Sequence, residues 1–253
     1  MGAGHAHPLY IHEHSPVHRM VPETKIVAAF GIVACIAITP REAVWAFGLY
    51  AFLLVVLDFV ARIPLRFALV RLAAVVPFIL FALFLPFLGT GETVRVVGIE
   101  MSVEGLWAAW NIIAKAALGA SVTIVLTATT EVPELIRGLG VLRVPVLFTS
   151  IATFMVRYLE LISDELRRMR VAMTARGYDP RWLAQARPIA TSAGALFVRS
   201  YERGERIHDA MLSRGFTGDM PAFGRRRAAG SEWLVAVSVL VVFALVCGLA
   251  SIT

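Results

Sequence analysis

Two short segments share one pattern, and each places an arginine where it could bind a partner. Residues 173–179 read MTARGYD and residues 211–217 read MLSRGFT, so a methionine, an Arg-Gly pair and an aromatic residue recur. Glycine commonly ends a helix, and a cation near that end complements the helix dipole. An arginine there also has the fork geometry that pairs with a carboxylate. The pattern predicts helix termination, carboxylate docking, or both.

A second group with chemical potential lies near the N-terminus. His5, His7, His12 and His14 form two close pairs, and imidazole is a suitable ligand for Co²⁺ and Ni²⁺. Histidine-rich tails also bind such ions weakly without a function, and we favour that interpretation. These four residues are weak candidates for metal ligands.

The sequence lacks the residues that most catalysis requires. Lys25 and Lys115 are the only lysines, and no GxxxxGK[ST] loop for nucleotide phosphates is present. Outside the tail His208 is the only histidine, which disfavours a membrane enzyme. We expect no enzyme activity and no cofactor bound by this chain.

Two charged residues fall inside apolar segments. A cation at the position of Lys115 costs at least about 2.5 kcal/mol unless it finds water, a carbonyl group or an acid. We expect a structural role for Lys115, next to Asn111 on the same helix face, with substrate passage as the alternative. Asp58 could pair with Arg62 one turn later.

Composition indicates a membrane protein. Of 253 residues 58% are apolar and 17% are charged, and the mean hydropathy is +0.74. Polar residues are too scarce to cover a globule of this size in water, so the excess apolar surface must meet lipid. The net charge of +6 does not indicate a nucleic-acid partner, because the basic residues alternate with apolar runs.

Five apolar runs predict an all-α polytopic protein with about five transmembrane helices. They cover residues 26–38, 43–61, 68–88, 106–128 and 233–250, and only the first is clearly shorter than a typical span. One side of this arrangement carries 21 lysines and arginines and the other carries two. The positive-inside rule therefore predicts a cytoplasmic N-terminus and a location in the cell (inner) membrane.

The region between the fourth and fifth runs is predicted to form long amphipathic helices. Its apolar stretches at 146–156 and 188–198 are too short to span, and they end in arginines. Pro145 and Gly177 frame one helix, and Asp179-Pro180 and Gly215 frame a second stretch. The predicted organisation is a polar segment (1–24), four spans (25–130), a cytoplasmic helical region (131–230) and a last span (231–253).

Three features support a family resemblance: the two Arg-Gly ends, the run LFVRSYERGERIHDAMLSRGFTGDMP at 196–221, and HSPVHRMVPETKIVA at 14–28. They resemble the transmembrane T component of energy-coupling-factor (ECF) ABC transporters, and most closely the CbiQ type from cobalt or nickel uptake. The resemblance covers nearly the whole chain. In that family two such motifs, at the ends of crossing coupling helices, dock onto a pair of ATPase subunits.

The resemblance implies which residues dock and which partners are present. By position the docking residues are Ala175, Arg176 and Gly177 in the first motif and Ser213, Arg214 and Gly215 in the second. It also implies ATP and Mg²⁺ on two cytoplasmic ATPases, and a separate substrate-binding membrane subunit (S component). The expected function is coupling of ATP-driven motion to cobalt or nickel uptake. A T component for a vitamin and an autonomous carrier are the alternatives.

Overall fold

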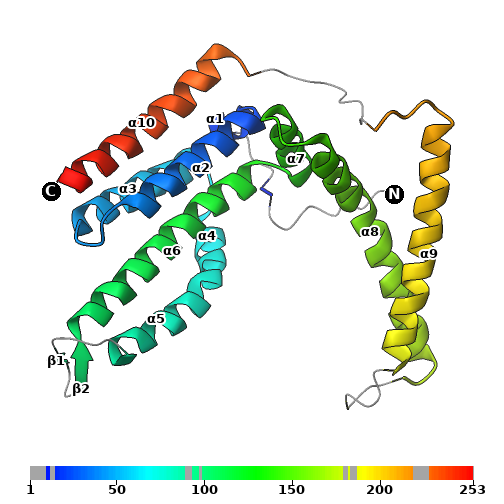
Figure 1. Cartoon of the computed structure of the whole chain (residues 1–253), viewed down its shortest axis with the longest axis horizontal. Coiled ribbons are helices and arrows are strands. Elements are labelled where there is room, and N and C mark those ends of the chain that lie inside the picture. The colour runs from blue at the N-terminus through cyan, green and yellow to red at the C-terminus, as the bar shows by residue number, and fades with distance from the viewer. Residues whose placement is uncertain are drawn as a thin grey trace. The chain divides into compact units, whose positions relative to one another are not determined.

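The computed structural model describes residues 10–11, 15–88, 93–96, 99–178, 182, 187–218 and 228–252. These residues are mainly helical, and the chain divides into two compact units (Figure 1). The unit of Met1–Gly138 and Arg226–Thr253 is called the membrane bundle here. The unit of Leu139–Arg225 is called the helix-pair unit.

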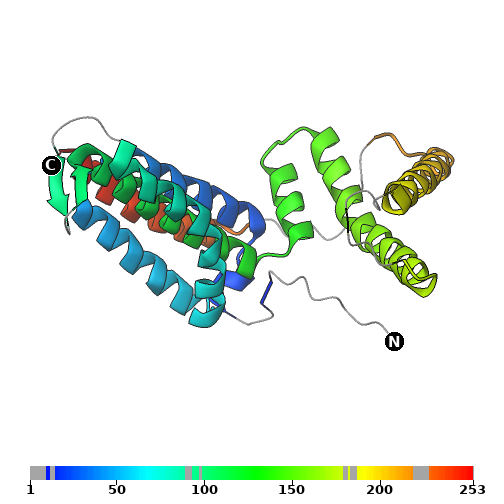
Figure 2. The same ribbon diagram turned by 90° about the horizontal axis from the view of Figure 1, so that it is seen from below.

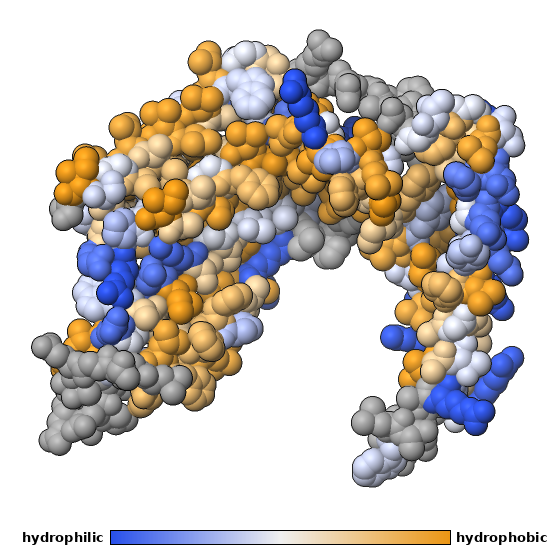
Figure 3. All heavy atoms as spheres, viewed as in Figure 1, coloured by the Kyte–Doolittle hydropathy of each residue, from blue (hydrophilic) through white to orange (hydrophobic). Residues whose placement is uncertain are grey.

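The membrane bundle has helices that are apolar on their outward as well as their inward sides. They are α1 (Pro16–Arg19), α2 (Pro22–Ile38), α3 (Val44–Val60), α4 (Leu65–Leu72), the 3-10 turn η1 (Ala73–Val75), α5 (Val76–Leu88), α6 (Val103–Thr129), the first part of α7 (Val132–Val141), and α10 (Gly230–Ile252). Phe59 and Ile252 are 84% and 86% exposed, and hydrophobic residues cover much of the visible side of these helices (Figure 3). Lipid is the solvent that suits such a surface.

The helix lengths fit a multi-pass membrane protein. Leu65–Phe87, Val103–Thr129, Val146–Ala175 and Gly230–Ile252 are long and apolar enough to cross a membrane, and Val44–Val60 is a shorter apolar helix. Helix α2 starts at Pro22, earlier than the apolar run, and its 17 residues extend about 25 Å. That length lies at the lower limit for a span. The predicted all-α polytopic class is confirmed.

Helix α8 (Val146–Ala175) meets this length and composition criterion, although its sequence indicates an amphipathic helix. Its first 11 residues carry no charge and end at Arg157, and Glu160, Asp164 and Glu165 follow within about two turns. About 11 apolar residues cover only about 17 Å of a hydrocarbon core that is about 30 Å thick. We therefore treat α8 as an amphipathic helix.

A short antiparallel hairpin, which the sequence analysis did not anticipate, lies between α5 and α6. Strand β1 (Thr93–Val96) pairs with β2 (Ile99–Ser102), and Thr93 is opposite Ser102 in the register. The hairpin satisfies backbone groups locally in a connection between two apolar helices. Ser102 then caps α6, because its Oγ accepts a hydrogen bond from Gly105 N at 3.4 Å.

The helix-pair unit contains α8 and α9 (Arg187–Leu212). Helix α8 has the predicted limits, with Pro145 at its N-cap and Gly177 just after its C-cap. Helix α9 is described from Arg187, with Pro188 in its first turn, and the predicted start at Asp179-Pro180 is not among the described residues. Residues 179–181 and 183–186 lie outside the described residues.

The core of the membrane bundle lies among α2, α3, α6 and α10, which run side by side (Figures 1 and 2). Tyr50 on α3 is fully buried and stacks on Phe243 of α10, with ring centroids 5.4 Å apart. Its hydroxyl lies 3.1 Å from Thr39 Oγ1 and donates to the carbonyl oxygen of Phe243 at 3.4 Å. The hydroxyl of this buried tyrosine therefore has a hydrogen-bond partner on both α2's C-cap and α10.

Helices α2 and α10 approach closely at Gly31. A Cβ atom at this position would lie 2.6 Å from Leu240 Cδ1 and 2.9 Å from Leu240 Cγ. A Cβ atom at Gly48, in the second turn of α3, would have no atom within 4 Å. Both glycines lie inside apolar helices, but they differ in the space around them.

We predict that Gly31→Val lowers the free energy of unfolding by about 1–3 kcal/mol more than Gly48→Val does, because only the first valine overpacks a helix contact. Unfolding by sodium dodecyl sulfate in detergent micelles measures both values. Equal losses would show that α2 and α10 are not in close contact at this point.

Candidate functional site

The first arginine motif closes α8 with a complete C-terminal cap. Gly177 has a left-handed backbone with φ of +78°, which favours glycine. The amide of Tyr178 donates to Met173 O at 3.1 Å, and the amide of Gly177 donates to Thr174 O at 2.9 Å. These two bonds are the pair that defines a Schellman motif. Arg176 occupies the C-cap position between helix and glycine.

The second motif closes α9 in the same way. Gly215 has φ of +80°. The amide of Phe216 donates to Met211 O, and the amide of Gly215 donates to Leu212 O, both at 3.0 Å. The shared methionine, glycine and aromatic residue therefore occupy matching positions of one capping motif. Only the glycine is called for by the backbone geometry, since its φ is positive, whereas the methionine and the aromatic residue contribute a backbone carbonyl and a backbone amide. The cap therefore gives no role to the arginine side chain.

All six residues of the two triplets are exposed: Ala175, Arg176, Gly177, Ser213, Arg214 and Gly215. Among the described residues neither guanidinium forms a hydrogen bond or an ion pair. Both cations lie at the negative end of a helix dipole. Both helix ends thus leave a complete guanidinium fork available for a planar anionic group.

The two helices of the pair run antiparallel and are held by one carboxylate. Glu165 on α8 accepts from Arg199 Nη1 at 3.5 Å and from Arg203 Nη1 at 3.4 Å. The Glu165 side chain is only 12% exposed. Ser192 and Met173 also meet, 3.5 Å apart, toward the start of α9. Later residues of α9 therefore contact earlier residues of α8, which shows that the two helices are antiparallel.

This arrangement places the two arginines at opposite ends of the pair. Arg176 follows Glu165 by 11 residues, and Arg214 follows Arg203 by 11 residues. At 1.5 Å per residue each arginine lies about 16 Å along its helix from the ion pair, so the two arginines are on the order of 30 Å apart. They cannot both reach one anionic group.

A groove of about 380 Å³ lies between the helices on the Arg214 side of the ion pair. Its lining is mainly apolar and consists of Phe154, Tyr158, Ile162, Ser200, Arg203, Gly204, Ile207, His208 and Met211. His208, the only histidine outside the tail, therefore lies beside apolar groups. In the described residues no group of three or more His, Cys, Asp or Glu side chains could hold a metal ion.

The early histidines are only partly described. His5, His7, His12 and His14 lie outside the described residues. His18 has both ring nitrogens engaged: Nδ1 lies 2.7 Å from Ser15 Oγ, and Nε2 lies 3.1 Å from the carbonyl oxygen of Ile11.

The charged residues of the apolar segments are placed partly as expected. Lys115 donates to the carbonyl oxygen of Ala37, in the last turn of α2, at 2.7 Å. The predicted pair of Asp58 and Arg62 does not form, and Asp58 Oδ1 is buried without a hydrogen-bond partner in the described part of the chain. Arg62 follows the end of α3 with φ of 56°, so the helical spacing that would align the pair is lost.

The ion pair of Glu165 was missed in the sequence analysis. Glu165 follows Ile162 by three residues and therefore lies on the face of α8 that carries the groove residues. An acid on the apolar face of an amphipathic helix, with arginines four residues apart on the next helix, is a signal that could have revealed the contact.

Fold and site together define a class of protein: a multi-pass membrane protein with an antiparallel amphipathic helix pair that exposes an arginine at each far end. The family model for the cobalt transport protein CbiQ matches residues 13–223. The chain therefore belongs to the CbiQ family and is a transmembrane T component of an ECF transporter.

Named relatives agree with this assignment. The chain is 28% identical to the energy-coupling factor transporter transmembrane protein EcfT of Heliobacterium modesticaldum, over 94% of both chains. It is 30% identical to the cobalt transport protein CbiQ of Rhodobacter capsulatus, over 67% of this chain and 68% of that protein. It is 25% identical to EcfT of Bacillus subtilis, over 93% of this chain and 94% of that protein.

We predict that Glu165→Gln destabilises the contact between α8 and α9 by about 1 kcal/mol, because it weakens two charge-assisted hydrogen bonds at a mostly buried acid. Amides of α9 near residue 203 should then exchange with deuterium faster. Glu160→Gln is the matched control, since Glu160 is exposed on the same helix. Equal exchange in the two variants would contradict a clamping role for Glu165.

Proposed function

We propose that this chain is the coupling subunit of an ATP-driven importer for cobalt, with nickel as the next candidate. It transmits motion from two cytoplasmic ATPase subunits to a substrate-binding membrane subunit. The observation that carries the proposal is the pair of exposed arginines at opposite ends of one antiparallel helix pair. Two separate anionic sites on two partner subunits match that arrangement.

The docking chemistry follows from the geometry of the two ends. Each guanidinium at a C-cap can accept a partner's carboxylate through two parallel hydrogen bonds. The helix dipole does not satisfy the donors of that fork, because it acts only through its field. Arg176 and Arg214 thus act as the two docking groups, with Ala175, Gly177, Ser213 and Gly215 leaving space beside them.

The helices between the two docking groups act as levers. Relative movement of two ATPases would pull the two ends, about 30 Å apart, in different directions. The Glu165 ion pair lies midway and opposes separation of the helices. The chain makes and breaks no covalent bond, and ATP with Mg²⁺ is bound by the ATPases, since this sequence has no phosphate-binding loop.

The orientation in the membrane follows from the basic residues. The side with 21 lysines and arginines includes the N-terminus and the helix-pair unit, and it faces the cytoplasm. This places both docking groups where ATP-hydrolysing partners work, in the cell (inner) membrane. The apolar surface of the membrane bundle contacts lipid and the S component.

The substrate is the least constrained part of the proposal. Cobalt is supported by the description of the family and by the name of the relative from Rhodobacter capsulatus. The relatives named EcfT carry no substrate in their names, which keeps a vitamin as an alternative. An autonomous carrier would transport its substrate without any ATPase.

We predict that Arg176→Ala and Arg214→Ala each weaken docking of one ATPase by about 2–5 kcal/mol, because a desolvated carboxylate on the partner loses its cation. Lysine should rescue poorly, since an ammonium group cannot reproduce the guanidinium fork. Retention of ATPases on the immobilised chain, together with ATP-driven Co²⁺ uptake in liposomes, measures the effect.

Arg206→Ala is the matched control for this experiment, because Arg206 is an exposed arginine on α9 outside the cap. The isolated chain should neither hydrolyse ATP nor take up Co²⁺. Normal retention and uptake in the Arg176→Ala, Arg214→Ala double variant would leave helix termination as the whole role of both motifs.

Topology gives a second prediction. After replacement of Cys35 and Cys247, a cysteine at exposed Glu42, between α2 and α3, should react in intact cells with a thiol reagent that cannot cross membranes. A cysteine at exposed Ser163, on α8, should react only after the membrane is opened. The reverse pattern would invert the orientation.

A further inference from the structure

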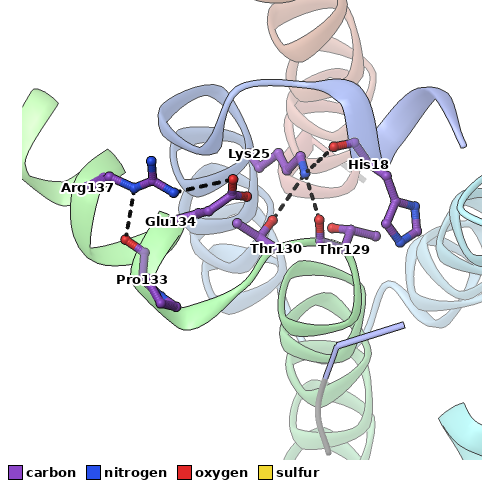
Figure 4. Close-up of polar contacts among 7 residues, drawn as sticks. All are labelled: His18, Lys25, Thr129, Thr130, Pro133, Glu134 and Arg137. Atoms are coloured by element: carbon purple, nitrogen blue, oxygen red, sulfur yellow. Dashed lines mark hydrogen bonds and ion pairs between the residues drawn. The ribbon is translucent and has the colours of Figure 1, made fainter. Parts of the chain in front are cut away.

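The ammonium group of Lys25 is buried and fully hydrogen-bonded. Lys25 is 7% exposed. Its Nζ donates to Thr129 O at 2.9 Å, to Thr130 Oγ1 at 3.2 Å and to His18 O at 3.4 Å (Figure 4). An ammonium group has three N–H donors, so each donor has one oxygen.

Two of the oxygens that bind this lysine belong to helix ends. In the described part of the chain no carboxylate forms an ion pair with Lys25. Thr129 is the last residue of α6 and His18 lies in the last turn of α1, so two of the oxygens are C-terminal helix carbonyls. Such carbonyls lack partners within the helix and carry the negative end of its dipole.

The site lies where the chain leaves the membrane bundle. Only Thr130 and Glu131 separate α6 from α7. Lys25 contacts both sides of this link, through the backbone of Thr129 and the side chain of Thr130. The boundary between the two compact units falls inside α7, after Gly138. The chain segment that leads from the membrane bundle to the helix-pair unit therefore begins at the residues whose oxygens bind Lys25.

The N-terminal segment closes the same site from another side. The amide of Ile11 donates to Ala128 O at 3.0 Å, next to the carbonyl that binds Lys25. Burial raises the pKa of the Tyr10 phenol, and the carboxylates of Glu131 and Glu134 raise it further. Ile11 thus holds the N-terminal segment on the last turn of α6, and the phenol of Tyr10 lies within electrostatic reach of Glu131 and Glu134.

A second contact fixes α7 against α2. A Cβ atom at Gly138 would lie 2.9 Å from Ile26 Cδ1, 3.0 Å from Pro22 Cβ and 3.2 Å from Glu23 N. A larger residue at 138 would therefore move α7 away from α2. A Cβ atom at Gly140, half a turn later, would have only Thr149 Cγ2 nearby, at 3.8 Å.

We propose that Lys25, together with the Gly138 contact, holds the start of α7 rigidly on the membrane bundle, so that force from the docking ends moves the bundle and does not bend the α6–α7 link. Lys25 is then a positioning residue for coupling. This inference rests on the proposed function.

The residue type agrees with this role. The chain has 24 basic residues, of which only Lys25 and Lys115 are lysines. A compact ammonium group directs three donors at three converging oxygens, whereas a planar guanidinium is built for flat anions. Lys115 binds a C-terminal carbonyl of α2 in the same manner, but it does so at the end of α2 that is far from α7.

The experiment uses the transporter complex copurified from its native membrane and reconstituted in liposomes. Four variants are compared with the wild type: Lys25→Met and Gly138→Val, with Lys115→Met and Gly140→Val as matched controls. Three quantities are measured: ATPase retention, Co²⁺ taken up per ATP hydrolysed, and deuterium exchange of the α7 amides.

We expect Lys25→Met and Gly138→Val to retain the ATPases and to keep hydrolysis near the wild-type rate. Co²⁺ uptake per ATP should fall by about ten-fold, the size of effect that loss of one coupling contact produces. Exchange of the amides at 132–138 should rise by about ten-fold, because α7 opens locally. Gly140→Val should keep the wild-type ratio, and Lys115→Met should keep wild-type α7 exchange.

If Lys25→Met does not assemble, Gly138→Val still tests the inference, since Gly138 takes no part in the hydrogen bonds of the lysine. Unchanged α7 exchange and an unchanged uptake ratio in the assembled variants would overturn the inference. Failure of the proposed function is seen separately, as a wild-type complex that takes up no Co²⁺ with ATP. In that case α7 exchange alone decides whether Lys25 and Gly138 hold the helix.

Discussion

The membrane bundle depends on a reciprocal exchange between α2 and α6, in which a lysine of each helix binds the C-terminal carbonyls of the other. Lys25 of α2 binds Thr129 O, and Lys115 of α6 binds Ala37 O. A cation removed from water and a helix end without hydrogen-bond partners are each unfavourable alone. Each lysine satisfies a carbonyl of the other helix, and the two contacts fix the register of these antiparallel helices, against which α3 and α10 pack.

Within the motif that ends each helix of the pair, structural residues can be distinguished from candidate functional residues. The positive φ of the Schellman cap favours glycine, and the methionine and the aromatic residue contribute a backbone carbonyl and a backbone amide to it. The arginine side chain forms no hydrogen bond or ion pair among the described residues. An arginine side chain is exposed at each of the two ends, which lie at opposite ends of the helix pair. This arrangement is the basis for the proposed docking.

Sequence patterns predicted features that depend on neighbouring residues. The limits of α8 at Pro145 and Gly177, the apolar helices and the exposed arginine ends follow from local spacing. The partner of Lys25 lies 104 residues away and has no local signal. The pair of Asp58 and Arg62 was predicted wrongly, because a helical spacing was extended beyond the end of α3. The predicted helix start at Asp179-Pro180 lies outside the described residues. Docking to ATPases stays a prediction.

The equal spacing of 11 residues from the ion pair to each arginine gives the helix pair a local pseudo-twofold axis. The axis passes near Glu165 and Arg203 and exchanges one capped end with the other. A chain with no internal repeat can thereby present a nearly symmetric surface to two copies of one protein, and homodimers commonly have twofold symmetry. The carboxylate breaks this symmetry, since the acid comes from one helix and the arginines from the other. Two identical subunits bound at these ends would therefore occupy equivalent positions with unequal surroundings.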